Sequence, residues 1–537
     1  MAQESKSTES IAVTAKVGAA GDKQDEDHEY LTGFQFYLAH ACIGIVLFVV
    51  ILDSTLISTA APAITDEFRS LKDLGWYSSV YYMTFCIAQL QFGKLMVRYP
   101  IRIVYTACMA LFLVGSGICG GAPNSVAFII GRAIAGVGAA GLLVGSFALI
   151  PILTPPPQRP AVTGIIGGVI GLAMSVGPMV GGAMTQNVTW RWNFYMNLPI
   201  GSACYFIFLL VIRPPSKAPP IDPLTLRTFV RKLDLYGLAL LTPCVVCLLI
   251  ALQWGGTTYA WSDRRIVALL VVSGILGLAF IAVEGWWAGS DAMIPKHIIS
   301  QQSVYASVFF ALTDVGAGYL FAYYIPIWFQ ASKGDDPLHA GVNTLPLVIV
   351  ECIASIVCGM GVASLGHIWP FMVAASCFTA VGAGLFTTWN RQSSIGVWIG
   401  YQIVYGVGMG LAAQTPLMVM QSLLAIEDMP IGSSLIMMTQ SLGGSIWVSV
   451  TQAIFVNKLR GGLARLGLPP QQIEQSLAGG LTDITRDLTG NVKTEAMDAV
   501  NDALVFAWKL PVFLTTISII GALGVQYRRS KAGPDKS

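Results

Sequence analysis

The chain has 537 residues, of which 54% are hydrophobic and only 11% are charged. Soluble domains carry about a quarter charged residues, so this composition excludes an ordinary soluble protein. A formal net charge of +2, without a basic patch interleaved with aromatic residues, gives no sign of nucleic-acid binding. Runs of roughly 20 apolar residues recur along most of the chain, and each is long enough to cross a bilayer. The sequence therefore predicts an all-α polytopic membrane protein.

Fourteen apolar segments are predicted to span the membrane, and an even number of crossings places both ends of the chain on one side. Lys and Arg are more frequent on that side than in the short loops opposite, which predicts cytoplasmic termini. The protein is expected to reside in the cell membrane, with a vacuolar or vesicle membrane as the alternative. The predicted spans are 36–58, 76–97, 103–121, 127–153, 160–184, 194–213, 234–253, 265–287, 303–330, 340–362, 369–388, 395–424, 431–456 and 503–525.

Polar segments between the spans predict the domain organisation. The polar N-terminal region shows no pattern of a cleavable signal peptide and is expected to be disordered. In chain order we expect a cytoplasmic tail (1–33), a six-helix bundle (34–213), a proline-rich basic cytoplasmic linker (214–233), two inserted transmembrane helices (234–300), a second six-helix bundle (301–525) that includes a long, partly helical outside loop (457–502), and a cytoplasmic tail (526–537).

A weak internal repeat relates the two predicted bundles. The segment Gly136–Gly138 in the fourth span recurs as Gly406–Gly408 in the twelfth. Gly93 and its short loop recur at Gly361, with nearly the same offset along the chain. Because the two offsets agree, the bundles read as parallel copies. Duplicated six-helix halves are typical of alternating-access carriers, in which the substrate binds between the halves near the membrane midplane.

Small residues form a stripe along one face of the fifth span. In lipid such a stripe allows another backbone to approach closely, and a proline inside a helical bundle is tolerated. The pattern fits a helix that rocks against a neighbour, or a tight static helix pair. The stripe consists of Gly164, Gly168, Gly171, Ser175, Pro178 and Gly182.

Four of the charged residues inside predicted spans are candidates for a functional role. They are Asp53, Arg132, Asp314 and Glu351. A charge in the hydrocarbon region is expensive and is a functional hypothesis by default. An acidic residue that gains and loses a proton as a cavity opens to one side or the other supplies the minimal chemistry of proton coupling. The alternative for each residue is a purely structural role in helix packing.

Aromatic and amide side chains suggest a wide amphipathic cavity in the second bundle. The candidates for its lining are Tyr319, Tyr323, Tyr324, Gln414 and Gln440. Several of them could equally pack in the helical core. Trp328, in the same region, is assigned to the membrane–water interface.

Other chemistry finds little support. All ten cysteines lie in apolar runs and the five histidines are scattered singly, which predicts no metal site, no cofactor and no catalytic residues. No phosphate-binding loop motif occurs, so ATP is not expected to be the direct energy source. A membrane-embedded enzyme and a non-transporting sensor are the competing classes. Asn187 begins an Asn-Val-Thr sequon in an outside loop and is a candidate glycosylation site.

Four motifs together resemble the major facilitator superfamily, in particular its fourteen-span drug:proton antiporter branch and the fungal exporters of mycotoxins and other secondary metabolites. The resemblance covers roughly residues 33–525. The first-helix motif includes Asp53, and the fourth-helix motif runs from Arg132 to Ala140. The antiporter motif comprises Gly168, Gly177, Pro178, Gly181 and Gly182, and the gating-loop motif comprises Gly93, Lys94, Arg98 and Arg102.

The resemblance implies a monomer that exchanges a small amphipathic molecule for protons across the lipid bilayer, with Arg132 implicated in proton transfer. Importers of siderophores and vacuolar carriers of basic amino acids belong to the same wider branch and remain alternatives. The chain departs from the family at Val97, where the loop motif usually has aspartate, and at Ala135, where glutamine is common. Asp314 and Glu351 match no family motif, so their proposed roles rest only on the presence of a carboxyl group inside a predicted span.

Overall fold

The computed structural model describes residues 30–70, 73–211, 234–256, 259–286, 292–335, 337–466 and 490–525, and these are helical apart from short connections and one isolated bridge between Gly255 and Tyr259. The predicted tails, apart from their inner edges, the linker 214–233 and the middle of the outside loop lie outside the described residues. The first half contains α2 (Gly33–Phe68), α3 (Leu74–Arg98), α4 (Ile101–Gly120), α5 (Ser125–Leu153), η2 (Pro156–Gln158), α6 (Arg159–Asn187), α7 (Trp192–Tyr195) and α8 (Asn197–Val211).

The inserted helices are α10 (Leu235–Trp254) and α11 (Arg264–Trp286), followed by the short α12 (Lys296–Ile299). The second half begins with a long helix that contains two π-helical turns. Its elements are α13 (Gln302–Phe310), η4 (Ala311–Val315), α14 (Gly316–Trp328), η5 (Phe329–Lys333), α15 (Pro337–Leu365), α16 (Trp369–Phe386), α17 (Ile395–Ala412), α18 (Thr415–Leu423), η6 (Ile426–Asp428), α19 (Met429–Arg465), α22 (Gly490–Ala507) and α23 (Lys509–Gly524).

Within the described ranges, twelve helices are long and apolar enough to cross a membrane. Two further predicted spans, 76–97 and 431–456, coincide with α3 and α19, which are helical but carry more polar residues and are not among the twelve. Gln89, Gln91 and Lys94 are buried polar residues on α3, and α19 is rich in serine. A count of fourteen spans therefore stays a prediction.

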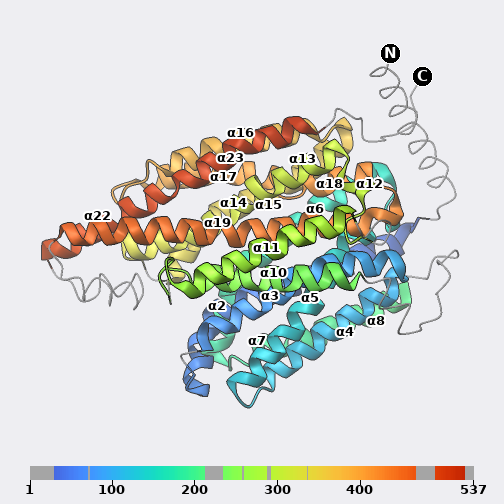
Figure 1. The fold of residues 1–537 in the computed structure, drawn as a ribbon, viewed down its shortest axis with the longest axis horizontal. Helices are drawn as coiled ribbons and strands as arrows, with labels where there is room; N and C mark the ends of the chain where they lie inside the picture. Colours follow the sequence, from blue (N-terminus) through green and yellow to red (C-terminus); the bar gives the residue numbers. More distant parts are fainter. Residues whose placement is uncertain are drawn as a thin grey trace.

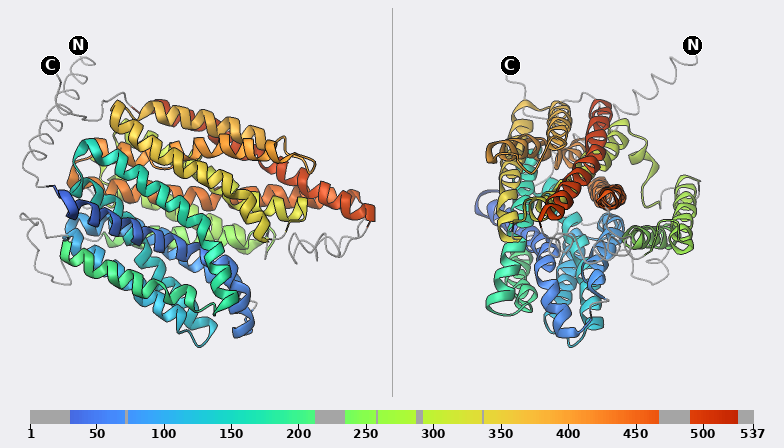
Figure 2. Two further views of the ribbon diagram at one scale, coloured as in Figure 1. Left: turned by 180° about the vertical axis from the view of Figure 1, so that it is seen from behind. Right: turned by 90° about the vertical axis from the view of Figure 1, so that its left-hand side faces the viewer.

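The two halves lie side by side and touch mainly through two helix pairs, with smaller contacts between α5 and α19 and between α6 and α18. Helix α6 packs against α15 on one face, and α3 packs against α19 on the other (Figures 1 and 2). The green helices α10 and α11 lie outside the bundle, level with the boundary between the halves, as the right-hand view of Figure 2 shows. Helix α2 begins and α23 ends at the same end of the molecule (Figure 1), which we call the terminal face.

The glycines of one pair of predicted repeat segments, Gly136–Gly138 and Gly406–Gly408, occupy equivalent positions in the two halves. The other pair does not match, because a Cβ on Gly93 would meet Ser434 of α19 in the second half and one on Gly361 would meet Phe371 of α16 in its own half. A Cβ on Gly136 would lie 2.5 Å from the Tyr81 carbonyl oxygen of α3, and one on Gly406 would lie 2.6 Å from the Leu347 carbonyl oxygen of α15. A Cβ on Gly138 or on Gly408 would likewise lie within 2.5 Å of the backbone of α4 or of α16. The absence of a side chain thus permits backbone contact at matching places, as small residues do in membrane helix packing.

Candidate functional site

A buried ion pair occupies the centre of the first half. Arg132 of α5 donates from Nη1 to Asp53 Oδ2 of α2 at 2.6 Å, and neither side chain is exposed. Asn197 of α8 donates to the other carboxylate oxygen at 2.8 Å. Both oxygens of Asp53 are therefore satisfied by side chains from two other helices, which is the condition for keeping a charge inside a helical bundle.

Further contacts hold the Arg132 guanidinium in place. Its Nε donates to the Tyr77 carbonyl oxygen at 3.1 Å, and its carbon lies 4.2 Å from the centre of the Tyr81 ring. Asn197 also donates to Ser116 at 3.2 Å. Sequence reasoning singled out Asp53 and Arg132 but missed their pairing and missed Asn197, whose only signal is an amide inside an apolar segment.

Asp314 is the buried carboxylate of the second half, and its surroundings differ from those of Asp53. Its Oδ2 accepts hydrogen bonds from Ser518 of α23 at 2.6 Å and from Thr379 of α16 at 3.1 Å. Its Oδ1 is buried and has no hydrogen-bond partner among the residues that the structure describes. The described residues form no ion pair with Asp314. Hydroxyl groups are thus its partners, whereas Asp53 faces a guanidinium.

Asp314 lies in the π-helical turn η4, where α19 packs against the chain. The indole of Trp447 donates to the Leu312 carbonyl oxygen at 2.7 Å, and a Cβ on Gly443 would lie 2.8 Å from the same oxygen. A π-turn disturbs the regular hydrogen bonding of a helix and is often found at functional sites. The turn therefore carries the Asp314 carboxyl and also contacts α19, a helix that lies at the interface between the halves.

Glu351 of α15 is half-buried and has no hydrogen bond or ion pair within the part of the chain that the structure describes. It lies near the phenol of Tyr319. Its backbone packs against α17, since a Cβ on Gly410 would collide with the Glu351 carbonyl oxygen. An unpaired carboxylate at a partly open position is suited to contact a mobile ligand or proton.

The five predicted lining residues divide into two groups. Tyr319 and Tyr323 are 38% and 52% exposed, whereas Tyr324 is buried in the core. Gln440 donates to the Ala413 carbonyl oxygen at 3.2 Å, at the break between α17 and α18. Gln414 is buried at the same break, where its Cγ would lie 2.6 Å from a Cβ on Gly167 of α6. The two amides therefore serve the helix break and the interface.

Trp328 is buried inside the protein and does not face a membrane–water interface, contrary to the sequence prediction. It is fully buried, donates to Asn501 at 2.8 Å and lies 4.5 Å from Trp389 between ring centres. Aromatic rings from α14, η5, α16 and α17 meet here together with Trp389 and Trp508, and ring packing of this kind outweighs the preference of tryptophan for an interface.

The glycines of the antiporter motif face two different neighbours. A Cβ on Gly168 would meet Ile356 of α15 at 3.2 Å, in the other half. Gly177 and Gly181 instead face α2 of their own half, where a Cβ on Gly181 would lie 2.5 Å from the Thr59 hydroxyl. Gly182 has open space beside it, and Pro178 lies inside α6. Helix α6 therefore contacts the other half near the terminal face, and it contacts α2 of its own half near the opposite end of the molecule.

Contacts between the halves close the molecule at the terminal face. Thr163 of α6 donates to Gln421 of α18 at 3.0 Å, and Ser355 of α15 donates to the Gly164 carbonyl oxygen at 3.1 Å. Gly93 of α3 packs on α19, where a Cβ would lie 2.9 Å from the Pro430 carbonyl oxygen. Toward the opposite face the helices of the two halves diverge (Figures 1 and 2).

The gating-loop residues lie at the same terminal face. Lys94 Nζ lies 3.9 Å from Asp234 Oδ2 at the start of α10, and both side chains are buried. Arg102 donates to the Leu209 carbonyl oxygen at 2.5 Å, and Arg98 is half-buried in the last turn of α3. Val97, where the motif usually has aspartate, is half-buried and packs against the core.

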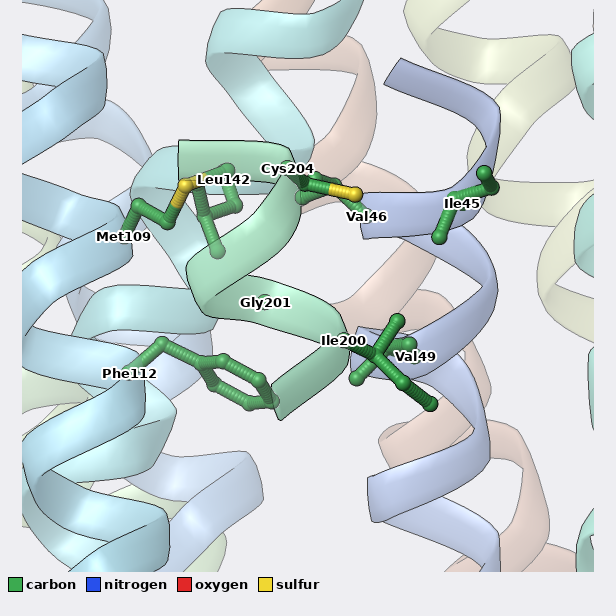
Figure 3. A pocket seen from close by; sticks show the side chains of 9 residues that line it. All are labelled: Ile45, Val46, Val49, Met109, Phe112, Leu142, Ile200, Gly201 and Cys204. Atoms are coloured by element: carbon green, nitrogen blue, oxygen red, sulfur yellow. The ribbon is translucent and has the colours of Figure 1, made fainter. Parts of the chain in front are cut away.

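Two other features lie away from these groups. Asn187 ends α6 with an exposed side chain that donates to the Ala183 carbonyl oxygen at 2.9 Å. Figure 3 shows a small pocket between α2, α4, α5 and α8. Apart from the Cys204 thiol its lining is apolar, and it holds no charged group that could bind a polar ligand.

Comparison with known proteins agrees with this architecture. The profile of a family described as Major Facilitator Superfamily matches residues 43–448. The MFS-type transporter phomT of Diaporthe leptostromiformis is 41% identical over 511 residues, which cover 94% of this chain and 85% of that protein. Efflux pump aflT of Aspergillus parasiticus is 36% identical over 515 residues, which cover 95% of this chain and 99% of that protein. The predicted resemblance to fungal efflux pumps is confirmed.

A solved structure supports the fold independently of sequence. The MFS proton:xylose symporter XylE superposes with a TM-score of 0.60 over 93% of this chain and 97% of that one. The two are 12% identical, so this likeness concerns the fold alone.

Proposed function

The chain belongs to the Major Facilitator Superfamily and is a multi-pass membrane transporter of small molecules rather than an enzyme, and from this premise we propose that it exports an amphipathic secondary metabolite or toxin in exchange for protons. The names of its relatives, which include efflux pumps, support the direction of transport. The single observation that supports proton coupling is Asp314, a fully buried carboxylate with hydroxyl partners and no cation among the described residues.

We place fourteen spans in the membrane, counting α3 and α19, with both termini in the cytoplasm and a monomer as the working unit. Some of the polar residues that keep α3 and α19 out of the apolar set join the two helices across the halves. Gln89 of α3 donates to Ser441 of α19 at 3.4 Å. Polar residues inside membrane helices face the interior of a bundle or a water-filled cavity. Their presence on α3 and α19 therefore fits helices that line a transport route.

The proton-carrying role falls to Asp314 rather than Asp53. The Asp53 charge is balanced by Arg132, and taking up a proton there would leave a buried guanidinium uncompensated. Asp314 loses no ionic partner when it is protonated, because its neighbours Ser518 and Thr379 are neutral hydroxyls. Uptake and release of a proton at Asp314 therefore change the charge of the second half with little rearrangement.

The substrate route lies between the halves, and the described conformation is closed at the cytoplasmic end. The exposed rings of Tyr319 and Tyr323, with the unpaired carboxylate of Glu351 nearby, offer aromatic surface and a single charge. Such a site suits a flat, amphipathic molecule, because ligand pockets combine apolar and aromatic walls with a few polar groups. After the substrate leaves to the outside, the halves close there and reopen toward the cytoplasm.

Transport by the purified protein in proteoliposomes tests this proposal. A pH gradient is imposed, and uptake of a panel of hydrophobic fungal metabolites and fluorescent dyes is measured in vesicles that hold the protein inside out. Asp314→Asn should abolish gradient-driven uptake but retain exchange of substrate in the absence of a gradient. Asp502→Asn, at an exposed position on α22, is the matched control and should behave as wild type. Gradient-driven uptake that survives in Asp314→Asn would assign coupling elsewhere, with Glu351 next.

The same assay separates export from import. Uptake by inside-out vesicles that collapses with the gradient is expected of an exporter. If the wild type instead accumulates labelled siderophores or basic amino acids in right-side-out vesicles, the importer alternative replaces the export proposal.

A further inference from the structure

Helix α10 is fastened to α3 at both ends of the bundle. At the terminal face, Lys94 Nζ of α3 lies 3.9 Å from Asp234 Oδ2 at the start of α10, with both side chains buried. At the opposite face, Gln253 of α10 donates to the Gly75 carbonyl oxygen of α3 at 3.1 Å. The rings of Trp76 and Trp254 meet edge to face beside this bond, 6.5 Å apart. Charge, hydrogen bonding and ring packing thus all connect these two helices.

The two attachments are in register across the membrane. Gly75 and Lys94 are as far apart in the sequence of α3 as Asp234 and Gln253 are in the sequence of α10. A helical segment of this length spans about 28 Å, close to the thickness of the hydrocarbon core. The helices therefore run antiparallel, side by side, with one polar attachment near each membrane surface.

Helix α11 is joined to α10 in turn. Ser273 Oγ of α11 donates to the Cys244 carbonyl oxygen at 2.9 Å, and the Cys244 thiol donates to the Ser273 carbonyl oxygen at 3.3 Å. Near the terminal face the carboxylates of Asp234 and Glu284 converge on Gly237, where a Cβ would lie 2.6 and 2.8 Å from their oxygens. The pair α10–α11 thus forms one body.

The contact of this body with α19 is apolar. Met438 of α19 is buried in one cluster with Leu90 of α3, Leu241 of α10 and Phe280 of α11, and Leu442 packs against the same cluster. Apolar side chains have no preferred partner in a bilayer, since lipid tails are equally apolar. Such a surface can slide, whereas the attachments to α3 fix both position and register.

We infer that α10 and α11 are a fixed part of the first half, carried by α3, and that α19 slides past them as the halves move. In Figure 1 the pair lies in front of the seam between α3 and α19, and in the right-hand view of Figure 2 it stands on one side of the bundle. It therefore shields the α3–α19 seam from lipid throughout the cycle. A substrate that enters from the bilayer is left with the α6–α15 seam. This inference rests on the alternating-access motion of the proposed function.

Distances between spin labels in nanodiscs test the inference. Labels go to exposed positions at Leu278 of α11, Ile103 of α4 in the first half and Leu523 of α23 in the second half, in three pairwise combinations. Distances are measured at pH 5 and pH 8. The 278–103 distance should be the same at both pH values, while the 278–523 and 103–523 distances change together. A 278–103 distance that changes while 278–523 stays constant would assign the pair to the second half and overturn the inference.

A second measurement does not require the halves to move. In the double variant Lys94→Met and Gln253→Leu, the 278–103 distance distribution should broaden at least about twofold, because both attachments are removed. Met438→Ala, which trims the apolar contact with α19, is the matched control and should leave the distribution narrow. An unchanged 278–103 distribution in the double variant overturns the inference. This outcome does not depend on whether the 103–523 distance shows that the halves move.

Discussion

Gly164 of α6 and Gly359 of α15 meet backbone to backbone where the two halves close the terminal face. A Cβ on Gly164 would lie 2.9 Å from the Gly359 Cα, and a Cβ on Gly359 would collide with the Pro160 carbonyl oxygen. Real Cβ atoms do not approach backbone this closely, so any side chain at either position must push the helices apart. The conformation described here depends on these two glycines.

Gly164→Val should therefore shift the transporter away from the conformation that is closed at the terminal face. Overpacking of a tight contact costs about 1–3 kcal/mol, which changes the ratio of conformations by roughly 5- to 150-fold. Thiol labelling of a cysteine placed at Gln421, which is buried at the closure beside Thr163, should become faster in this variant. Gly182→Val is the matched control on the same helix, because Gly182 has open space beside it. Equal labelling rates in the two variants would refute the role of the contact.

The Asp53–Arg132 pair should be far more sensitive to the loss of one charge than to the loss of both. Removing one partner of a buried ion pair costs about 3–5 kcal/mol, because the other charge stays buried and uncompensated. Asp53→Asn and Arg132→Met should each lower the melting temperature strongly, and the double variant should recover much of the loss. Thermal unfolding in detergent measures this. Additive losses in the double variant would show that the two charges do not interact.

The sequence was sufficient to predict which residues are candidates for function. It did not predict which residues on other helices they contact. Asp53 and Arg132 stand out because charges are rare in apolar spans, but they are 79 residues apart and nothing local indicates that they meet. The glycine repeat was predictive because its offset reflects a duplicated fold, and Gly136 and Gly406 do contact equivalent helices. The sequence placed Gln440 in a cavity lining. Its hydrogen bond to the Ala413 carbonyl oxygen could not be predicted, because the helix break at Ala413 depends on tertiary structure.

The π-turn at Asp314 also lies beyond sequence reasoning. Residues 311–315 carry no proline or glycine that would mark an irregular helix, and the turn is satisfied from outside by Trp447, which lies far along the chain on α19. Likewise, the attachment of α10 to α3 joins Lys94 to a residue beyond the linker. The charge pattern indicates that Lys94 needs a partner, but it does not indicate which one.

Trp447→Phe should lower the free energy of unfolding only slightly. It should reduce proton-gradient-driven transport much more strongly. The variant keeps an aromatic ring but removes the bond to the Leu312 carbonyl oxygen, and hydrogen bonds between membrane helices contribute about 0.6 kcal/mol on average. Gradient-driven transport should fall several-fold, because the π-turn that carries Asp314 loses its connection to α19. Trp508→Phe is the control, since the buried Trp508 indole has no hydrogen-bond partner among the described residues. Similar transport defects in both variants would indicate a general packing effect.

The end of the first half that lies away from the terminal face should weaken in acid through Glu67, which lies beyond the predicted membrane segment of α2. The Trp190 indole donates to Glu67 at 2.6 Å and Arg191 donates to its other oxygen at 2.7 Å, and these two partners hold the pKa of Glu67 below its ordinary value. Arg191 also donates to the carbonyl oxygens of Gly120 and Ala122, so the carboxylate organises three segments at this end.

A carboxyl group with a lowered pKa in the folded protein contributes stability above its ordinary pKa, and this contribution disappears as the pH falls through the folded-state value. The Arg191–Glu67 pair is 28% and 47% exposed, so the effect is small, at most about 1 kcal/mol. The melting temperature of the wild type should therefore fall more between pH 7 and pH 4 than that of Glu67→Gln. Glu495→Gln, at an exposed position on α22, should keep the full acid sensitivity. If Glu67→Gln loses as much stability in acid as the wild type, the carboxylate does not organise this end of the molecule.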